Sequence, residues 1–222
     1  MKATATILTI AAASMTASAS VTSYTETFES GANNWVSGAF TPTTWNATGS
    51  VDNSAYISSQ LDLNSAGPFG LTLLRGQDDQ NASGDAFVGN YLAGGITTVE
   101  FDFRHNAGVD LDIALRVATS ANFPAFAVES SSATVSGEWT HLTFDLFFGN
   151  PLLTIEGAPT PAAFNAVMEA VGNLQISAFR PDGLDSELIA DFDLDNVAIT
   201  PAPSGLAFLG LGCLGVSRRR RA

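Results

Sequence analysis

The sequence predicts an all-β protein whose main body is an antiparallel β-sandwich with one short helix. Apolar and polar residues alternate in several segments of four to seven residues, which is the side-chain period of a strand with one buried face. Glycine, asparagine, serine and proline fill the intervals between these segments, as they do in turns. Only one segment has helical spacing. About nine or ten short strands with such turns are typical of a sandwich.

Four segments alternate clearly and are predicted as strands: Val99–Arg104, Leu111–Val117, Thr140–Leu146 and Phe192–Asp195. Five further segments show the pattern more weakly: Tyr24–Phe28, Ala55–Ser58, Gly70–Leu74, Phe126–Glu129 and Leu174–Phe179. The predicted turns between them include Asn33-Asn34, Ser65–Pro68, Asn81–Gly84 and Pro181–Gly183. Together these strands span one domain, which we place at residues 20–200.

The predicted helix runs from Thr160 to Val171. Thr160 can cap it, and Pro161 suits its first position because the amide there has no helical partner. Four apolar residues then recur at helical spacing: Phe164, Val167, Met168 and Val171. We expect this helix to pack over one end of the sandwich.

Composition limits the partners of this body. All 22 acidic residues lie in it, with only four of the nine basic ones, which gives residues 20–200 a net charge of −18. Such a charge disfavours nucleic acid and anionic membrane surfaces as partners. The single cysteine, Cys213, lies outside the body, so the body can form no disulfide and no cysteine-ligated zinc site.

Both ends of the chain predict export. Met1-Lys2, an apolar stretch and Ala17-Ser18-Ala19 fit a signal peptide that signal peptidase cleaves after Ala19. At the other end, Pro201-Ala202-Pro203 is followed by an uncharged apolar run and then by Arg218, Arg219, Arg220 and Arg221. The run with its flanks, 205–217, is shorter than the about 20 residues of a relaxed membrane span, and the arginines suit a cytoplasmic anchor.

The last segment, residues 201–222, resembles the PEP-CTERM sorting signal of exported bacterial proteins, with Ala202 in place of the central glutamate. The resemblance implies that the tail is held in the inner membrane and processed by an exosortase. The body would then reach the cell surface or the extracellular polysaccharide. The alternative is a plain membrane tail that is retained.

Two distant stretches of the body resemble jelly-roll carbohydrate-binding modules and galactose-binding-like domains. They are Thr27–Gly31, with Trp35 close behind, and Asp191–Val197. The resemblance implies that the first and last strands lie side by side, and that Glu29 and Asp195 bind a structural calcium ion. Asp52 or backbone carbonyls could complete the oxygen ligands. The alternative is a β-bulge at Asp195-Asn196, which shifts the inward face of that strand to Val197 and Ile199.

Sugar binding would use exposed aromatic rings beside amides and carboxylates. Trp45 and Tyr91 lie in polar, turn-rich segments next to Asn46 and Asn90, and Tyr56 is a third candidate. Trp139 is a weaker candidate. Trp35 and Trp139 are predicted to lie in the core or at its edge, which is the more common position of tryptophan in sandwiches.

No nucleophile or metalloprotease motif occurs, and His105 and His141 are the only histidines. The sequence therefore predicts a non-enzymatic protein of the cell surface or polysaccharide matrix whose body binds, or simply resides in, extracellular polysaccharide. A passive structural protein is the first alternative. The second is a glycan-active hydrolase or lyase that uses a carboxylate pair such as Glu100/Asp102 or Asp110/Asp112.

Overall fold

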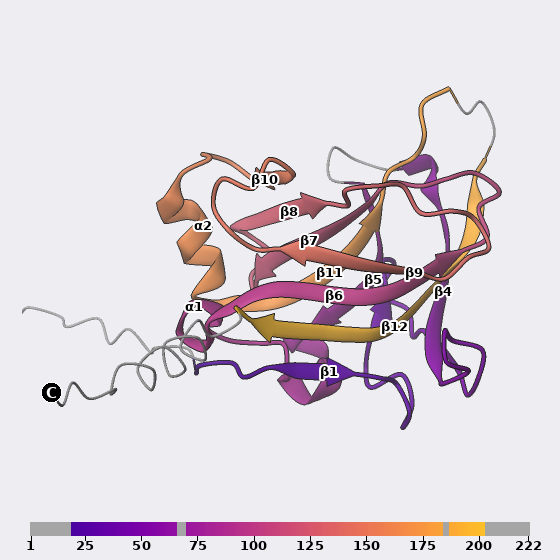
Figure 1. Ribbon diagram of the computed structural model, residues 1–222, viewed down its shortest axis with the longest axis horizontal. Coiled ribbons are helices and arrows are strands. Elements are labelled where there is room, and N and C mark those ends of the chain that lie inside the picture. Colours follow the sequence, from indigo (N-terminus) through magenta and orange to yellow (C-terminus); the bar gives the residue numbers. More distant parts are fainter. Residues whose placement is uncertain (1–18, 66–69, 184–186, 203–222) are drawn as a thin grey trace, which may run out of the picture.

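Two antiparallel sheets face each other in the computed structural model, which describes residues 19–65, 70–183 and 187–202 (Figure 1). The first sheet has the strand order β3 (Thr44–Asn46), β4 (Tyr56–Asp62), β12 (Ile189–Pro201), β6 (Ile96–His105) and β9 (Thr140–Asp145), and β1 (Tyr24–Glu26) also pairs with β12. The second sheet has the order β10 (Leu153–Ile155), β8 (Ala125–Glu129), β7 (Ile113–Thr119), β11 (Val171–Ala178), β5 (Leu71–Gln77) and β2 (Val36–Ser37). The predicted antiparallel sandwich is confirmed.

The core lies between the two sheets, where the inward residues of their central strands meet. From the first sheet it includes Phe101, Phe103, Phe144, Phe192 and Leu194, and from the second Leu74, Leu115, Val117, Phe126, Leu174 and Ile176. Their burial removes apolar surface from water, which is the main favourable contribution to folding. The alternating residues on the opposite side of the first sheet are mostly polar, and they form its outer face.

All nine predicted strands are present, with ends that differ by a few residues. The described residues contain twelve strands rather than nine or ten, because β2, β3 and β10 were not predicted. The helix α2 (Pro161–Met168) begins as expected, since the Thr160 side chain accepts a hydrogen bond from the Ala163 amide. It ends earlier than predicted, and Val171 instead begins β11.

Further short helices are α1 (Tyr91–Gly94) and the 3₁₀ turns η1 (Leu63–Ser65), η2 (Asp78–Gln80) and η3 (Ala82–Asp85). Among the described residues no helix is long and apolar enough to span a membrane. The signal peptide and the sorting tail fall almost entirely on residues 1–18 and 203–222, outside the described residues.

The first and last strands lie side by side, as the resemblance implied. β1 pairs antiparallel with β12, with Tyr24 opposite Ile199 and Glu26 opposite Val197. The predicted bulge is also present: the pairing of β12 with β6 shifts between Asp195 and Ala198, and Asn196 has a left-handed backbone with φ of 51°. Val197 and Ile199 consequently continue the core after Phe192 and Leu194.

Candidate functional site

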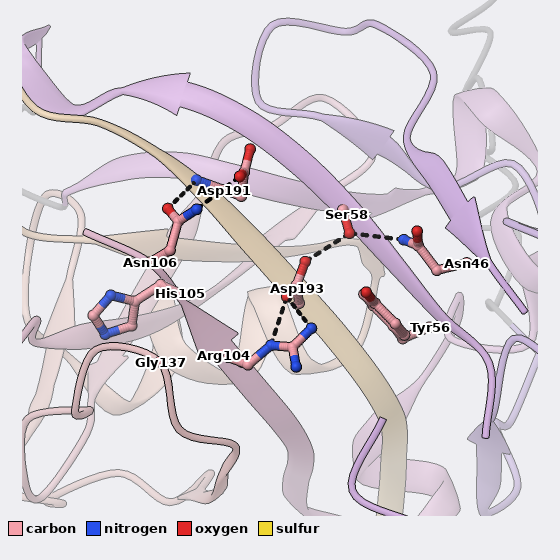
Figure 2. A pocket seen from close by; sticks show the side chains of 9 residues that line it. All are labelled: Asn46, Tyr56, Ser58, Arg104, His105, Asn106, Gly137, Asp191 and Asp193. Carbon is pink, nitrogen blue, oxygen red and sulfur yellow. Dashed lines mark hydrogen bonds and ion pairs between the residues drawn. The ribbon is translucent and has the colours of Figure 1, made fainter. Parts of the chain in front are cut away.

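The outer face of the first sheet carries a polar cleft of about 450 Å³ (Figure 2). Strands β4, β6 and β12 form its floor, and β3 forms one edge. The remaining lining residues are Asn106, which follows β6, and Gly137, which precedes β9. Its lining residues are Asn46, Tyr56, Ser58, Arg104, His105, Asn106, Gly137, Asp191 and Asp193. Most of them alternate with core residues of the same strands, so the pattern that builds the core also exposes these side chains on the opposite face.

A row of hydrogen bonds crosses this face from β6 to β3. The Arg104 guanidinium donates through Nε to Asp193 Oδ2 at 2.8 Å and forms a second contact with the same oxygen through Nη2 at 2.7 Å. The other oxygen of Asp193 accepts from the Ser58 hydroxyl at 2.6 Å, and Ser58 accepts from the Asn46 amide at 2.9 Å. The strand register causes this row, because Asp193 lies opposite both Arg104 and Ser58.

A second row closes one end of the cleft. Asn106 donates its amide to Asp191 Oδ2 at 2.7 Å and accepts from the Asp191 backbone amide at 2.8 Å. Gln60 donates to the other carboxylate oxygen at 2.9 Å. The two aspartates are thus fixed in place while the cleft remains open to solvent. Fixed amides and carboxylates of this kind are suited to a ligand rich in hydroxyl groups.

Two aromatic rings enclose the Arg104 guanidinium at the other end of the cleft. Its central carbon lies 4.6 Å from the ring centroid of Trp139 and 5.2 Å from that of Tyr56. The two rings meet edge to face with centroids 5.5 Å apart. The Trp139 indole donates to the Gly49 carbonyl at 3.1 Å. We call Tyr56, Arg104 and Trp139 the ring cluster.

The structure separates the predicted aromatic residues. Tyr56 lines the cleft, as a sugar-binding residue would. Tyr91 is fully buried and donates its hydroxyl to the Phe87 carbonyl at 2.9 Å, so the prediction that it is an exposed sugar-binding ring is wrong. Asn90 accounts for the error: it caps the one-turn helix α1 and does not frame a surface ring. Trp35 is buried in the core, as predicted.

Trp45 is exposed but does not belong to the cleft. It lies opposite Ile57, a core residue, whereas its neighbours Thr44 and Asn46 lie opposite Ser58 and Tyr56 of the cleft face. Because opposite residues of an antiparallel pair point to the same side, Trp45 points away from the cleft, and its indole donates to the Phe28 carbonyl at 2.7 Å. Trp139, predicted to lie in the core or at its edge, is half-buried beside the cleft and is not part of the core.

The three predicted calcium ligands lie around the loop of residues 47–55, which joins β3 to β4. Asp195 is fully buried and accepts hydrogen bonds from the Ser50 and Ser54 hydroxyls and from the Asn196 amide. Burial raises the pKa of its carboxyl, and the bonds from Ser50 and Asn196 oppose that rise. Glu29 accepts from the Ala55 amide at 3.3 Å, and Asp52 from the Ser54 amide at 3.0 Å.

These contacts do not fit a calcium site well. Protein donors already occupy both oxygens of Asp195, and calcium needs six to eight oxygen ligands. The part of the chain that the structure describes has no group of three or more histidine, cysteine, aspartate or glutamate residues placed to hold a metal ion. Calcium binding by Glu29, Asp52 and Asp195 therefore stays a prediction.

The two carboxylate pairs predicted as candidates for catalysis lie in different parts of the fold. Glu100 and Asp102 lie on β6 next to His141, whose Nδ1 is 2.8 Å from Asp102 and whose Nε2 is 3.7 Å from Glu100. Asp110 and Asp112 precede β7 instead of lying on it, and they line a separate cleft of about 320 Å³ with Arg180. Neither pair lines the cleft on the outer face of the first sheet.

His105 adjoins the cleft, but its imidazole is buried on the core side of β6, opposite Phe192, and is neutral there. Its Nδ1 accepts from the Ala107 amide at 3.4 Å, and its Nε2 lies 3.2 Å from the Thr134 carbonyl, to which it donates. Burial lowers the pKa of this imidazole below its ordinary value. A histidine with a lowered folded-state pKa stabilises the protein above its unfolded pKa of about 6.5, and this contribution is lost as pH falls toward the folded value.

We therefore expect acid to destabilise the wild type more than a His105→Gln variant. Lowering the pH from 7 to 5 should reduce the difference in unfolding free energy between the two proteins, with a slope of at most about 1.4 kcal/mol per pH unit. Urea unfolding at several pH values measures this difference. A difference that stays constant over this range would contradict a neutral, buried His105.

Most residues of the cleft were not predicted from the sequence, although alternation within the strands could have identified some of them. Arg104 and Asp193 are the outward residues of two strands that were predicted correctly. Asn106 and Asp191 lie just beyond the predicted ends of those strands. Alternation could have placed all four on one face, but only the strand order brings β6, β12 and β4 together.

Comparisons with known proteins give fold similarities only. No family model matches the chain, and no curated protein matches it. A structure of the CBM22-1 and GH10 modules of endo-1,4-β-D-xylanase 10B from Clostridium thermocellum, complexed with xylohexaose, is 17% identical over 81% of this chain and 28% of that chain, with a TM-score of 0.49.

Two further structures are similar at lower scores. The L4b domain of human laminin alpha-2 is 10% identical over 83% of this chain and 99% of its own, with a TM-score of 0.47. The family 30 carbohydrate-binding module of a cellulosomal cellulase from Clostridium thermocellum is 12% identical over 84% of this chain and 95% of its own, with a TM-score of 0.40. At such identities the similarity concerns the fold and not the ligand.

Proposed function

We propose that this protein binds a neutral polysaccharide, without catalysis, in the cleft on the outer face of the first sheet. The ring cluster carries the proposal. Tyr56 lines the open cleft and Trp139 lies beside it, both against the Arg104 guanidinium, and aromatic rings in such positions stack on the apolar C–H faces of sugar rings. The amides and carboxylates along the groove would bind the hydroxyl groups of the same chain.

Charge favours a neutral ligand over an acidic one. The cleft contains the carboxylates of Asp191 and Asp193 against the single guanidinium of Arg104, which already pairs with Asp193. The body as a whole has a net charge of −18. A polyuronate or sulfated polysaccharide would be repelled over a long range at low salt, whereas a neutral glycan would not.

Titration of the full chain with soluble polysaccharides tests the proposal. We expect binding to at least one neutral polymer among xylan, mixed-linkage β-glucan, galactomannan and dextran, and weaker or no binding to alginate and polygalacturonate. Tyr56→Ala should weaken that binding about tenfold, equivalent to about 1.4 kcal/mol. Trp45→Ala, which removes an exposed ring outside the cleft, should leave it unchanged.

Three results would contradict the proposal. Equal losses from Tyr56→Ala and Trp45→Ala would place binding elsewhere. An absence of binding to every polysaccharide, including those of the producing cells, would favour the passive structural role. Release of sugar from any of these polymers, lost in Glu100→Gln or Asp102→Asn, would instead favour the glycan-active enzyme.

Export and sorting form a separate part of the proposal, which rests on the two ends of the sequence. We expect signal peptidase to cleave after Ala19 and an exosortase-type enzyme to process the chain near Pro201–Pro203. Intact-mass measurement of protein recovered from the surface of the producing cells should therefore show a species without residues 1–19 and without the terminal arginines. Recovery of the full-length chain from the cytoplasm would contradict export.

A further inference from the structure

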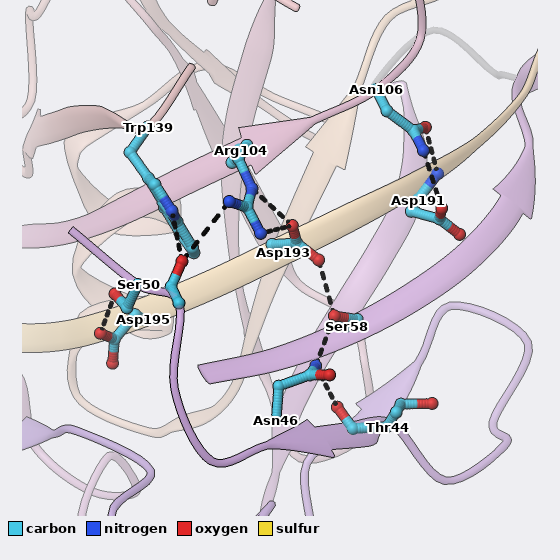
Figure 3. A network of polar contacts seen from close by, with 11 residues as sticks. Thr44, Asn46, Ser50, Ser58, Arg104, Asn106, Trp139, Asp191, Asp193 and Asp195 are labelled. Carbon is cyan, nitrogen blue, oxygen red and sulfur yellow. Dashed lines mark hydrogen bonds and ion pairs between the residues drawn. The ribbon is translucent and has the colours of Figure 1, made fainter. Parts of the chain in front are cut away.

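The buried carboxylate of Asp195 lies close to the cleft but does not line it. It is on β12, on the cleft side of the first sheet, and it is fully buried because the 47–55 loop covers it. Its Oδ2 accepts from the Ser50 hydroxyl of that loop (Figure 3). The same oxygen accepts from the Ser54 hydroxyl at 2.9 Å. Its Oδ1 accepts from the Asn196 amide at 2.7 Å. Two of its three contacts therefore fasten the loop to the sheet.

Gly49, the residue before Ser50, touches all three members of the ring cluster. Its carbonyl accepts from the Trp139 indole at 3.1 Å and from Arg104 Nη1 at 3.4 Å. A Cβ added at Gly49 would lie 3.3 Å from Cε1 of Tyr56, so its backbone packs against that ring. The backbone here also needs glycine, because its φ is 111°. One loop residue therefore contacts both rings and the guanidinium, and it supplies the acceptor that holds the Trp139 indole.

The loop has few other contacts to hold it. Within the loop, the Ser50 amide donates to the Ser54 carbonyl at 3.2 Å, and the Asn53 amide donates to the Ser50 carbonyl at 3.1 Å. These two bonds shape the turn but do not attach it to the sheet. Val51, Asp52 and Asn53 are exposed. The Ala55 amide bonds to Glu29 at the far end of the loop, at 3.3 Å. Asp195 is thus the anchor beside Gly49, and two hydrogen bonds to a charged acceptor form it.

We propose that Asp195, through Ser50 and Ser54, is a positioning residue for the carbohydrate cleft: it holds Gly49 where its carbonyl fixes Trp139 and Arg104. This assignment rests on the proposed function for its effect on binding, but its effect on Trp139 is independent of any ligand. Asp195 itself touches no ligand. Its role is to hold the Trp139 indole in the orientation in which a sugar ring would stack on it. Binding then avoids the entropic cost of ordering the indole and the loop.

A Ser50→Ala/Ser54→Ala double variant of the full chain tests the assignment. It removes both loop donors and leaves β12 intact. The measured quantity is hydrogen exchange at the three tryptophan indole N–H groups, followed by two-dimensional NMR and assigned with Trp139→Phe. We expect exchange at Trp139 to accelerate at least tenfold. Exchange at Trp35, bonded to Ser83, and at Trp45, bonded to the Phe28 carbonyl, should not change, since the acceptors of both indoles lie outside the loop.

Binding of the neutral polysaccharide that the wild type prefers should weaken three- to tenfold in the same variant. Ser59→Ala is the matched control, because it removes a buried serine hydroxyl of β4 that bonds to the Leu73 carbonyl at 3.0 Å, away from the loop. It should change neither measurement. Ser50→Thr, which retains the hydroxyl, should restore slow exchange relative to Ser50→Ala. If the double variant does not fold, Ser50→Ala alone replaces it.

The possible results separate this inference from the proposed function. Unchanged exchange at Trp139 in the double variant overturns the positioning role, whatever the binding data show. Accelerated exchange with unchanged polysaccharide binding also overturns it, because the loop would then not serve the cleft. If the wild type binds no polysaccharide, the proposed function fails, while accelerated exchange confined to Trp139 still supports the contact chain from Asp195 to the indole.

Discussion

Replacing Trp139 with alanine should weaken polysaccharide binding about thirtyfold or more, a larger loss than for any other single substitution in the cleft. Such a loss corresponds to at least about 2 kcal/mol, the size found for aromatic residues at the centre of binding sites. The variant loses the larger of the two stacking surfaces. It also removes the ring 4.6 Å from the Arg104 guanidinium, leaving that side chain less restrained.

Isothermal titration with the preferred neutral polysaccharide measures this loss, and Trp45→Ala serves as the matched control. Both tryptophans are at least partly exposed, and each donates one hydrogen bond to a backbone carbonyl, but only Trp139 belongs to the ring cluster, where it contacts Tyr56 and Arg104. The stability of the two variants should be similar by urea unfolding. A Trp139→Ala variant that binds like the wild type would remove the main support for the cleft as the binding site.

The alternation of apolar and polar residues was sufficient to predict nine strands, because a half-buried strand has that period over several residues. β2, β3 and β10 have only two or three residues each and were not predicted, whereas β1, with three, was predicted only as part of the five-residue segment Tyr24–Phe28. A period of two is not recognisable within two or three residues alone. For the same reason Trp45 was treated as part of a turn-rich segment, whereas it is the central residue of β3.

The second sheet shows a further limit of the pattern. Leu111–Val117 was predicted as a half-buried strand with a solvated polar side, yet every residue of β7 from Ile113 to Ala118 is buried. Alanines occupy part of its outer side, and Arg116 there is covered by Glu156 and Asn122 from other segments. The tertiary structure decides which distant segments cover the face of a sheet. The sequence of a single strand does not contain this information.

The site depends on strand order in the same way. Tyr56 was predicted as a candidate, but its partner Trp139 lies 83 positions away and meets it only because β4, β12, β6 and β9 are neighbours in one sheet. Asp195 was predicted as a metal ligand because the segment Asp191–Val197 resembles the last strand of jelly-roll carbohydrate-binding modules. Its serine partners come from a loop about 140 positions earlier, with |i−j| of 145 for Ser50 and 141 for Ser54. Neither contact has a signal in local sequence.

The buried ion pair of Arg116 and Glu156 leads to the largest expected effect on stability. All five N–H groups of the Arg116 guanidinium have acceptors: the two oxygens of Glu156, the side chain and carbonyl of Asn122, and the side chain of Gln175. The side chains of the pair are only 11% and 15% exposed. Removing Glu156 leaves a buried guanidinium with no opposite charge beside it, held only by the neutral acceptors of Asn122 and Gln175.

Glu156→Ala should therefore lower the free energy of unfolding by about 3–5 kcal/mol, measured by urea unfolding at pH 7. Glu129→Ala, which removes an exposed carboxylate from β8, is the matched control and should change it by no more than about 0.5 kcal/mol. The double variant Arg116→Met/Glu156→Leu separates the cost of an unpaired charge from the net contribution of the pair. Because apolar side chains of similar size avoid desolvating any charge, this double variant should lose much less stability than Glu156→Ala. If the double variant loses as much unfolding free energy as Glu156→Ala, the unpaired charge is not the main cause of the loss. The hydrogen bonds of Arg116 to Asn122 and Gln175 would then be the interactions that stabilise this face of the second sheet.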